Sequence, residues 1–309
     1  MADLRIVSLI PSATEIIHSL GLGDCLVGRS HECDYPASVQ SLPVCTEPKF
    51  EPEGSSPEIH DRVTTLLQSA LSVYRVKTEV LEPLRPTHIL TQAQCEVCAV
   101  SLGDVEAAVA QLTDSQPQVI SLQPNRLMDL WTDFQTVAVA LEGKAGMARA
   151  QAAIAPLQQR LHDLANQVQR LEQPTVACIE WPDPLMAAGN WVPELVELAG
   201  GQCLFGTAGQ HSPWLDWPSL VAANPDCIVF MPCGYDLAKT AVEAKPLTRR
   251  PEWSTLKAVQ NQRVFITDGN QYFNRPGPRL VDSAEILAEI FHAQPIGSGY
   301  GDRGWQLFR

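Results

Sequence analysis

The chain has 309 residues, of which 45% are hydrophobic, and it carries a formal net charge of -13. This length and composition are enough to bury a full core in two lobes of ordinary size. The acidic balance, with no run of Lys or Arg, argues against nucleic acid or an anionic membrane surface as the main partner. No stretch approaches the roughly 18 uninterrupted apolar residues of a membrane span, so we expect no membrane insertion.

The first residues, "MADLRIVSLIPSATEII", lead almost directly into an apolar run and lack the basic region and cleavage site of a secretory signal. Nine cysteines, an odd number, fit a reducing compartment better than a disulfide framework. We therefore expect a cytoplasmic protein, or a periplasmic one if a signal has been removed.

The first half of the chain alternates short apolar runs with amphipathic segments. Strands are expected at "RIVSLI" (5–10), "CLVGRS" (25–30), "THILTQ" (87–92) and "QVISLQ" (118–123). Helices are expected after a cap at Ser12 or Thr14, over residues 58–84, which carry helical periodicity, and over 103–112. Such alternation predicts parallel strands with helices on both faces of the sheet.

Residues 127–171 read as a long helical region, interrupted near Gly143 and Gly146 and kinked at Pro156. Its second part carries one apolar seam, formed by Ile154, Leu157, Leu161, Leu164, Val168 and Leu171. The seam lasts under three heptads, which favours a helix packed across two lobes over a coiled-coil dimer. We accordingly expect a monomer.

The second half resumes the alternation and echoes the first. Strands are expected at 175–181, 226–232 and 263–269, and helices at 192–200, 236–244 and 279–292. The segment "EIIHSLGLGDCLVG" (15–28) matches "ELVELAGGQCLFG" (194–206) with one deletion. The sequence thus predicts two related α/β lobes, 1–125 and 174–309, joined by a stiff helical region over 126–173, with a cleft between the lobes.

Ligands of open parallel sheets collect at the carboxyl ends of the strands. The residues that follow the predicted strands, and that we expect to line the cleft, are His31, Cys33, Tyr35, Gln92, Cys95, Cys98, Trp181, Trp191, Tyr235, Tyr272, Phe273 and Arg275, with Trp214 and Trp217 at its rim. Aromatic side chains on both walls favour a large, flat, partly apolar ligand. The alternative is that several of the tryptophans only pack in the cores of the lobes.

The pair Cys95-x-x-Cys98 admits three readings. With His31 and Cys33 it could complete a site for zinc or iron, although "HEC" is not the tight paired knuckle of structural zinc sites. A thioredoxin-like redox pair would sit at a helix N-terminus in a different context. The preferred interpretation is that these cysteines line a pocket.

The chain lacks a G-x-S-x-G elbow, a P-loop and an H-E-x-x-H motif, so we expect no enzymatic activity.

Three stretches carry a family resemblance: "RIVSLIPSATEIIHSLGLGDCLVGRSHECDYP", "LRPTHILTQAQCEVCAV" and "WPSLVAANPDCIVFMP". With the long connecting helix, they resemble the cobalamin-binding branch of the class III substrate-binding proteins of ABC transporters, over nearly the whole chain. The resemblance implies two Rossmann-like lobes with parallel sheets, bridged by a rigid helix, and cobalamin or a related corrinoid bound between them. Relatives bind haem or iron-siderophores, which stay open as alternatives.

The same resemblance implies contacts from particular residues. Corrinoid contacts are expected from Tyr35, Pro36, Trp181, Trp191, Phe273 and Arg275, with the Cys95 region on the floor of the cleft. Coordination of cobalt by His31 or a cysteine is a hypothesis that rests on their predicted placement. The hydrophobic residues of the C-terminal tail, Trp305, Leu307 and Phe308, could dock on the body or on a partner.

Transport members of the resembled family dock on an ABC permease through an acidic residue on each lobe. Glu79 matches that position in the first lobe, whereas the matching position in the second is Pro218, with only Asp216 nearby. This departure and the lack of a signal leave a second hypothesis open, a cytoplasmic protein that binds or handles corrinoids.

Overall fold

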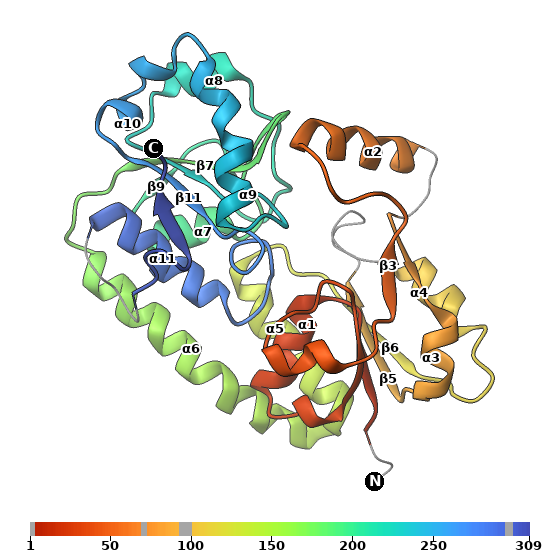
Figure 1. Cartoon of the computed structure of the whole chain (residues 1–309). Helices are drawn as coiled ribbons and strands as arrows, with labels where there is room; N and C mark the ends of the chain where they lie inside the picture. The colour runs from red at the N-terminus through yellow and green to blue at the C-terminus, as the bar shows by residue number, and fades with distance from the viewer. Residues whose placement is uncertain (1–3, 69–72, 93–100, 294–298) are drawn as a thin grey trace. The chain divides into compact units, whose positions relative to one another are not determined.

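The structure, a computed structural model, describes residues 4–68, 73–92, 101–293 and 299–309. The chain divides into two compact units, whose elements are drawn in Figure 1. Unit 1 comprises Met1–Gly54, Glu58–Pro124 and Met128–Pro156, and unit 2 comprises Ser55–Pro57, Asn125–Leu127 and Leu157–Arg309. None of the helices in the described ranges combines the length and the hydropathy needed to cross a membrane.

Unit 1 is built on a four-stranded parallel sheet in the order β2-β1-β5-β6. Its strands are β1 (Ile6–Ser8), β2 (Leu26–Arg29), β5 (His88–Gln92) and β6 (Gln118–Leu122). A separate antiparallel pair joins β3 (Thr46–Pro48) to β4 (Tyr74–Val76). The four parallel strands are those expected from the apolar runs of the first half.

The helices of unit 1 cover both faces of this sheet. They are α1 (Pro11–Ser19), α2 (Ser56–Gln68), α3 (Thr78–Leu84), α4 (Leu102–Val109), α5 (Leu127–Glu142) and the first part of α6 (Gly146–Val168). Leu81 of α3 and Val105 of α4 pack with Val7 and Ile89 in one core on one face of the sheet. Figure 1 shows α1 and α5 on the other side of these strands.

The expectation of helix over residues 58–84 is wrong in its middle. The structure has α2, then strand β4 (Tyr74–Val76), then α3. In β4, Tyr74 pairs with Pro48 and Val76 with Thr46, and Tyr74 is buried. Aromatic and β-branched residues favour strands, and a partner distant in sequence overrides the local helical periodicity.

The connecting region consists of α5 and α6, separated by a 3-10 turn at Gly143–Ala145. Gly143 has a φ of 63°, a conformation that glycine adopts without steric cost. A side chain at Gly146 would collide with the carbonyl of Ala138, so two glycines shape this break, as the sequence predicts. The α6 helix continues through Pro156, and Ile154 and Leu164 of the predicted seam are buried.

Unit 2 is built on a mixed sheet with β7 (Thr175–Pro182) near one end. Parallel β10 (Cys227–Phe230) and β11 (Val264–Thr267) extend it on one side and antiparallel β12 (Trp305–Leu307) closes that edge. On the other side lie antiparallel β8 (Leu185–Ala187) and parallel β9 (Gln202–Cys203). Because β12 comes from the tail, the tail docks on its own unit.

The helices of unit 2 are α7 (Val192–Leu198), α8 (Trp217–Ala223), α9 (Leu237–Ala244), α10 (Lys257–Gln260), α11 (Leu280–His292) and the end of α6. Leu220 of α8 and Ala244 of α9 share one core with Ile228 and Phe230 of the sheet. Figure 1 shows α7 and α11 on the other side of the strands.

The two units repeat a β-α-β element, as the matched sequence segments predict. In unit 1, α1 ends with the N–H of Leu22 donating to Ile17, and in unit 2, α7 ends with the N–H of Gly201 donating to Val196, at 3.0 and 2.9 Å. The strands that follow, β2 and β9, pair in parallel with β1 and β7. In both units, therefore, the same type of hydrogen bond ends the helix before the chain enters a strand parallel to the one that precedes the helix.

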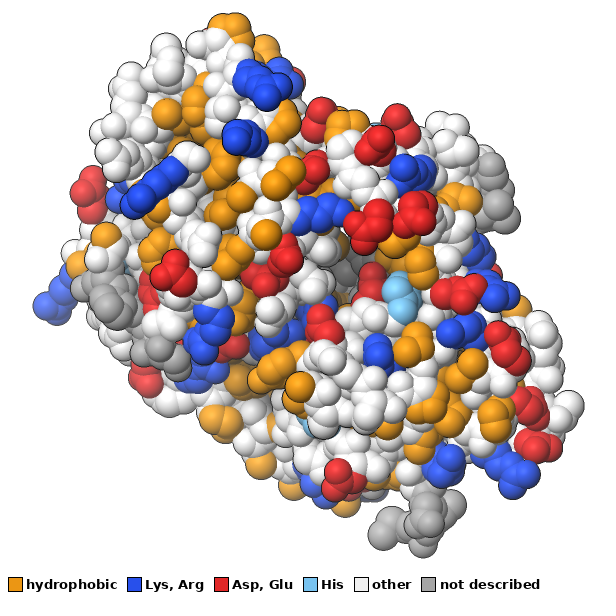
Figure 2. All heavy atoms as spheres, viewed as in Figure 1, with side chains coloured by type: hydrophobic (Ala, Val, Ile, Leu, Met, Phe, Trp, Pro, Cys, Tyr) orange, Lys and Arg blue, Asp and Glu red, His pale blue; other side chains and the backbone are white. Residues whose placement is uncertain are grey.

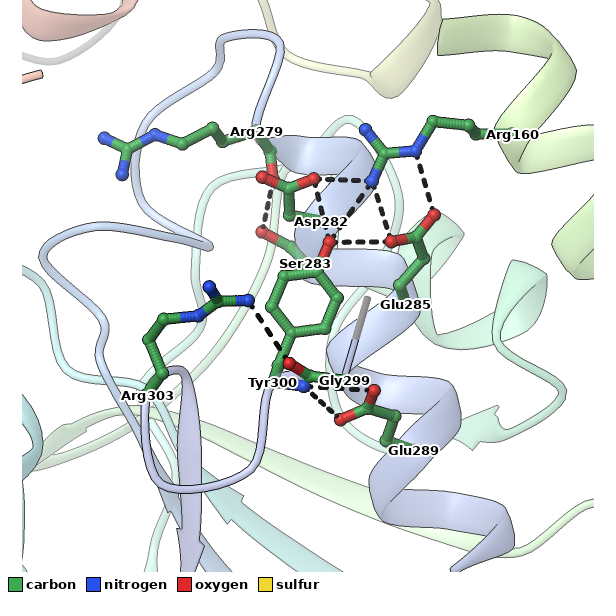
Figure 3. Close-up of polar contacts among 9 residues, drawn as sticks. All are labelled: Arg160, Arg279, Asp282, Ser283, Glu285, Glu289, Gly299, Tyr300 and Arg303. Atoms are coloured by element: carbon green, nitrogen blue, oxygen red, sulfur yellow. Dashed lines mark hydrogen bonds and ion pairs between the residues drawn. The ribbon is translucent and has the colours of Figure 1, made fainter. Parts of the chain in front are cut away.

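A polar cluster holds the tail on α11 (Figure 3). Nη2 of Arg160, from α6, donates to Asp282 at 2.6 Å and to Glu285 at 2.7 Å. The hydroxyl of Tyr300 donates to Glu285 at 2.7 Å, and the backbone N–H of Tyr300 donates to Glu289. Burial and the charge of Asp282 raise the pKa of Tyr300, so its phenol keeps the proton that it donates.

Candidate functional site

In unit 2 the strand order reverses between β7 and β10, because β9 follows β7 on one side and β10 lies on the other. Open parallel sheets bind ligands at the carboxyl ends of the strands at such a point. Trp181 stands near the end of β7, and Tyr235 follows β10. The structure brings these two predicted residues together at that point.

The rings of Trp181 and Tyr235 lie 5.1 Å apart, centroid to centroid, at an interplanar angle of 45°. The indole Nε1 of Trp181 donates to the carbonyl of Asp183 at 3.0 Å. Tyr235 is buried, whereas Trp181 is partly exposed. Tyr235 therefore backs Trp181, which can offer a ring face to a ligand.

Two residues that the sequence analysis missed hold Tyr235 in place. Its hydroxyl oxygen lies 3.2 Å from the hydroxyl of Ser56, and the carboxylate of Glu243 accepts from the N–H and the hydroxyl of Ser56 at 2.6 and 2.7 Å. All three residues belong to unit 2. Burial raises the pKa of Tyr235 to about 12, with a further contribution from Glu243, so the ring stays a neutral phenol.

Trp191 and Phe273, expected as ligand contacts, are buried within unit 2 and bonded to each other. Nε1 of Trp191 donates to the carbonyl of Phe273 at 2.7 Å, and the N–H of Phe273 donates to Ser283 at 3.0 Å. These bonds hold Phe273 at a φ of 40°, in the left-handed region, which costs about 1–2 kcal/mol. Both side chains shape the loop after β11 from within the unit.

The same loop carries Tyr272 and Arg275, and both side chains are buried. The ring of Tyr272 packs against Tyr300 of the tail at 6.2 Å, with the guanidinium of Arg279 5.6 Å from its ring. Nη2 of Arg275 donates to the side chain of Asn270 at 2.9 Å. The loop is thus fixed by its own polar groups and by the tail.

The two tryptophans expected at the rim differ in their surroundings. Trp217 stacks on Trp253 at 6.3 Å and 17°, and its Nε1 donates to Glu252 at 2.9 Å. It packs against the core beneath α8 and α9, so its role is the packing that the sequence analysis kept as an alternative. Trp214 is 63% exposed and forms a β-bridge with Met186 of β8.

In unit 1, His31 follows β2 and is held by Thr46. Its backbone N–H donates to Oγ1 of Thr46 at 3.1 Å, its Nδ1 lies 2.8 Å from the same oxygen, and its ring packs against Tyr74 at 5.0 Å. Burial lowers the pKa of His31 to about 4, assisted by the charges of Lys77 and Arg29. The imidazole is therefore neutral near pH 7.

Cys33 is buried, and its sulfur accepts from the hydroxyl of Thr14 at 3.1 Å. Cys95 and Cys98 lie outside the described residues. Among the residues that the structure describes, no group of three or more His, Cys, Asp or Glu could hold a metal ion. The expected zinc or iron site at His31, Cys33, Cys95 and Cys98 stays a prediction.

The remaining predicted residues of unit 1 are Tyr35, Pro36 and Gln92. Tyr35 is 48% exposed and precedes a cis bond to Pro36. Gln92, at the end of β5, is buried, and its Oε1 has no hydrogen-bond partner within the described ranges. A buried acceptor without a partner costs about 1–3 kcal/mol, so this oxygen is suited to a donor on a ligand.

A family model described as periplasmic binding protein matches residues 6–271. The chain belongs to the periplasmic binding protein family. This confirms the resemblance to class III substrate-binding proteins of ABC transporters, and with it the predicted fold of two α/β units and a long connecting helical region.

Two relatives illustrate the similarity. The chain is 27% identical over 300 residues to an ABC transporter substrate-binding lipoprotein, YvrC, of Bacillus subtilis, covering 93% of this chain and 80% of that protein. It is 25% identical over 285 residues to a vitamin B12-binding protein of Vibrio cholerae, covering 91% and 86%. The names of these relatives give no support to the expected cytoplasmic location.

Solved structures show the same fold. The periplasmic vitamin B12 binding protein BtuF of Vibrio cholerae superposes with a TM-score of 0.63 at 20% identity, covering 94% of this chain and 96% of that one. A periplasmic heme binding protein from Pseudomonas aeruginosa superposes with a TM-score of 0.71 at 18% identity, covering 95% of each chain. At these identities the likeness bears on the fold and leaves the ligand open.

As a periplasmic binding protein, the chain has two acidic candidates for contact with a permease. Glu79 is exposed in the first turn of α3, and Asp216 is the N-cap of α8, where it accepts from the N–H of Ser219 at 2.7 Å. Figure 2 shows Asp and Glu side chains interspersed with Lys and Arg on the face it draws. The contact through Glu79 stays a prediction.

Proposed function

We propose that this periplasmic binding protein binds a corrinoid, with cobalamin as the first candidate, and delivers it to the permease of an ABC importer. Its role is then binding, without catalysis. The observation that carries the proposal is the packing of Trp181 on Tyr235 at the point where the strand order of unit 2 reverses. A partly exposed indole backed by a second ring suits a large flat ligand.

Gln92 supports a corrinoid over haem. The edge of a corrin ring carries amide side chains, which can donate to the buried Oε1 of Gln92, whereas the edge of haem carries carboxylates, which cannot. Tyr235 supports the same choice, because its ring is buried and its hydroxyl is engaged with the hydroxyl of Ser56 at 3.2 Å, so its oxygen is not presented as a ligand to iron. The sequence similarity to vitamin B12-binding proteins, over nine-tenths of the chain, points the same way.

Titration of the purified protein with hydroxocobalamin and, separately, with haem tests the proposal. Tryptophan fluorescence would follow binding, and equilibrium dialysis would give the stoichiometry. We expect saturable binding of one cobalamin per chain, tighter than that of haem. Tighter binding of haem would overturn the corrinoid assignment, and stoichiometric zinc or iron with no response to either ring would favour the metalloprotein alternative.

Two variants localise the ligand on unit 2. Trp181→Ala should weaken cobalamin binding about tenfold or more, because a lost aromatic contact is worth about 1 kcal/mol or more beyond its buried area. Trp217→Phe is the matched control, since it also removes one indole but lies in the packing against Trp253. Equal cobalamin affinities for the wild type and Trp181→Ala would show that the ring of Trp181 does not contact the ligand.

A further inference from the structure

The hydrogen bonds around His31 assign its tautomer. Oγ1 of Thr46 donates its one hydrogen to the hydroxyl of Ser30 at 3.1 Å, and it accepts from the backbone N–H of His31. With that hydrogen in use, the 2.8 Å contact to Nδ1 requires Nδ1–H as the donor. The lone pair of the neutral ring is then on Nε2.

The ring is also fixed in orientation. The in-plane bonding directions of Nδ1 and Nε2 diverge from each other, so the bond from Nδ1 to Thr46 directs the lone pair of Nε2 away from that residue. Tyr74 packs against the ring at 5.0 Å, and its hydroxyl donates to Glu32 at 3.0 Å. Nε2 makes no hydrogen bond to any described residue. A neutral imidazole held by a hydrogen bond at one nitrogen is the usual arrangement of a metal-binding histidine.

We propose that Nε2 of His31 is an axial ligand to the cobalt of the bound corrinoid, so that the protein selects corrinoids with an axial position that is open or occupied by water. The inference rests on the proposed function. In the Co(III) form the nitrogen lone pair forms a Co–N bond, the bond from cobalt to water breaks, and the water leaves. No electron is transferred and no proton is needed.

The other candidate ligands of unit 1 fit this role less well. His88 lies at the amino end of β5, the opposite edge of the sheet from the one that binds ligands, and its Nδ1 contacts Thr87 at 2.9 Å. The thiol of Cys33 is buried against Thr14 and Ser8. His31 combines the carboxyl edge of the sheet, a fixed ring and a lone pair on Nε2.

Cobinamide tests the proposal, because this corrinoid lacks the nucleotide base and therefore brings no axial nitrogen of its own. We would bind cob(II)inamide to the full chain and record its electron paramagnetic resonance spectrum. A nitrogen ligand splits each cobalt line into three, and this splitting is the expected result for the wild type. It should disappear in His31→Ala and persist in His88→Ala.

Affinities supply a second measure. Dicyanocobinamide has both axial positions blocked and should bind the wild type and His31→Ala equally, whereas aquocobinamide should bind His31→Ala at least about tenfold more weakly, or ~1.4 kcal/mol. Saturable binding of cobinamide to the wild type without nitrogen splitting would overturn the axial ligand and leave the proposed function standing. No binding of any corrinoid would overturn both. The spectrum of the wild type shows whether a nitrogen ligand binds the cobalt even if a variant fails to fold.

Discussion

The hydroxyl of Tyr235 lies 3.2 Å from the hydroxyl of Ser56, whose backbone N–H and side chain both bond to Glu243. Residues 179 positions apart thus orient the ring that backs Trp181. Ser56 opens α2, and the three residues Ser55–Pro57 belong to unit 2 although the rest of that helix belongs to unit 1. The orientation of Tyr235 against Trp181 therefore depends on Ser56, a residue far from both in the sequence.

Glu243→Gln should lower the pKa of Tyr235. Burial is the main cause of the raised value of about 12, and the negative charge of Glu243 adds to it by disfavouring the phenolate. Glutamine keeps an acceptor for Ser56 but removes that charge. The measurement is a spectrophotometric titration of tyrosine, with Tyr235→Phe subtracted to isolate one phenol. A pKa that stays at its original value or rises would show that the charge does not reach the ring.

Asp133→Asn should stabilise the protein at neutral and alkaline pH. Asp133 is buried in α5, where desolvation and then the charge of Asp129 raise its pKa from 3.8 to about 7. Between those pH values the folded state binds more protons at Asp133 than the unfolded state does. The contribution of protonated Asp133 to the free energy of unfolding is therefore fully present below pH 4 and is lost as the pH rises through 7. Discounted for solvent screening, we expect a gain of about 1–3 kcal/mol at pH 8.

Urea denaturation of both proteins at several pH values measures this effect. The difference in free energy of unfolding should grow from pH 4 to pH 7 and then level off. Asp129→Asn is the matched control, because it removes the negative charge that is the second cause of the raised pKa of Asp133. In this variant the pH-dependent loss of stability due to Asp133 should end at a lower pH. A loss of stability in Asp133→Asn at pH 8 would mean that the fold needs the carboxylate in its charged form.

Arg160→Gln should destabilise unit 2. The change leaves Asp282 and Glu285 close together without their cation, and for this partly exposed pair we expect a loss of about 1–3 kcal/mol in the free energy of unfolding. Tyr300→Phe should cost less, about 1 kcal/mol, since it removes one hydrogen-bond donor. Arg170→Gln, at an exposed arginine of unit 2 that lies outside this cluster, is the control. Equal effects at Arg160 and Arg170 would contradict the role of the cluster in Figure 3.

Glu79→Gln combined with Asp216→Asn should slow transport without changing corrinoid affinity. Asparagine still caps a helix, so α8 keeps its N-terminal bond to Ser219 while the charge is lost. We expect cobalamin uptake, in bacteria that lack their own cobalamin-binding protein, to fall by about tenfold, or ~1.4 kcal/mol of docking energy. Glu106→Gln, at an exposed residue of α4, is the control. Unchanged uptake by the double variant would place the docking surface elsewhere.

The order of strands and helices could be predicted from the sequence because it is a local property. The apolar runs 5–10, 87–92 and 118–123 each became a parallel strand, and the repeated helix ending at Gly21 and Gly200 was visible as matching letters. Prediction failed at β4, where the partner of Tyr74 and Val76 is β3, nearly thirty residues upstream. Period and propensity cannot report a pairing of that kind.

The residues of the candidate site divide in the same way. The sequence alone determined that Trp181 and Tyr235 follow apolar runs, and the structure has both residues at the same edge of the unit 2 sheet. Only the tertiary structure decided that Trp191 and Phe273 bond to each other inside the unit, and that Thr46 sets the tautomer of His31. Burial and hydrogen bonding depend on side chains that long-range packing brings together, so residues of the same chemical type receive different roles.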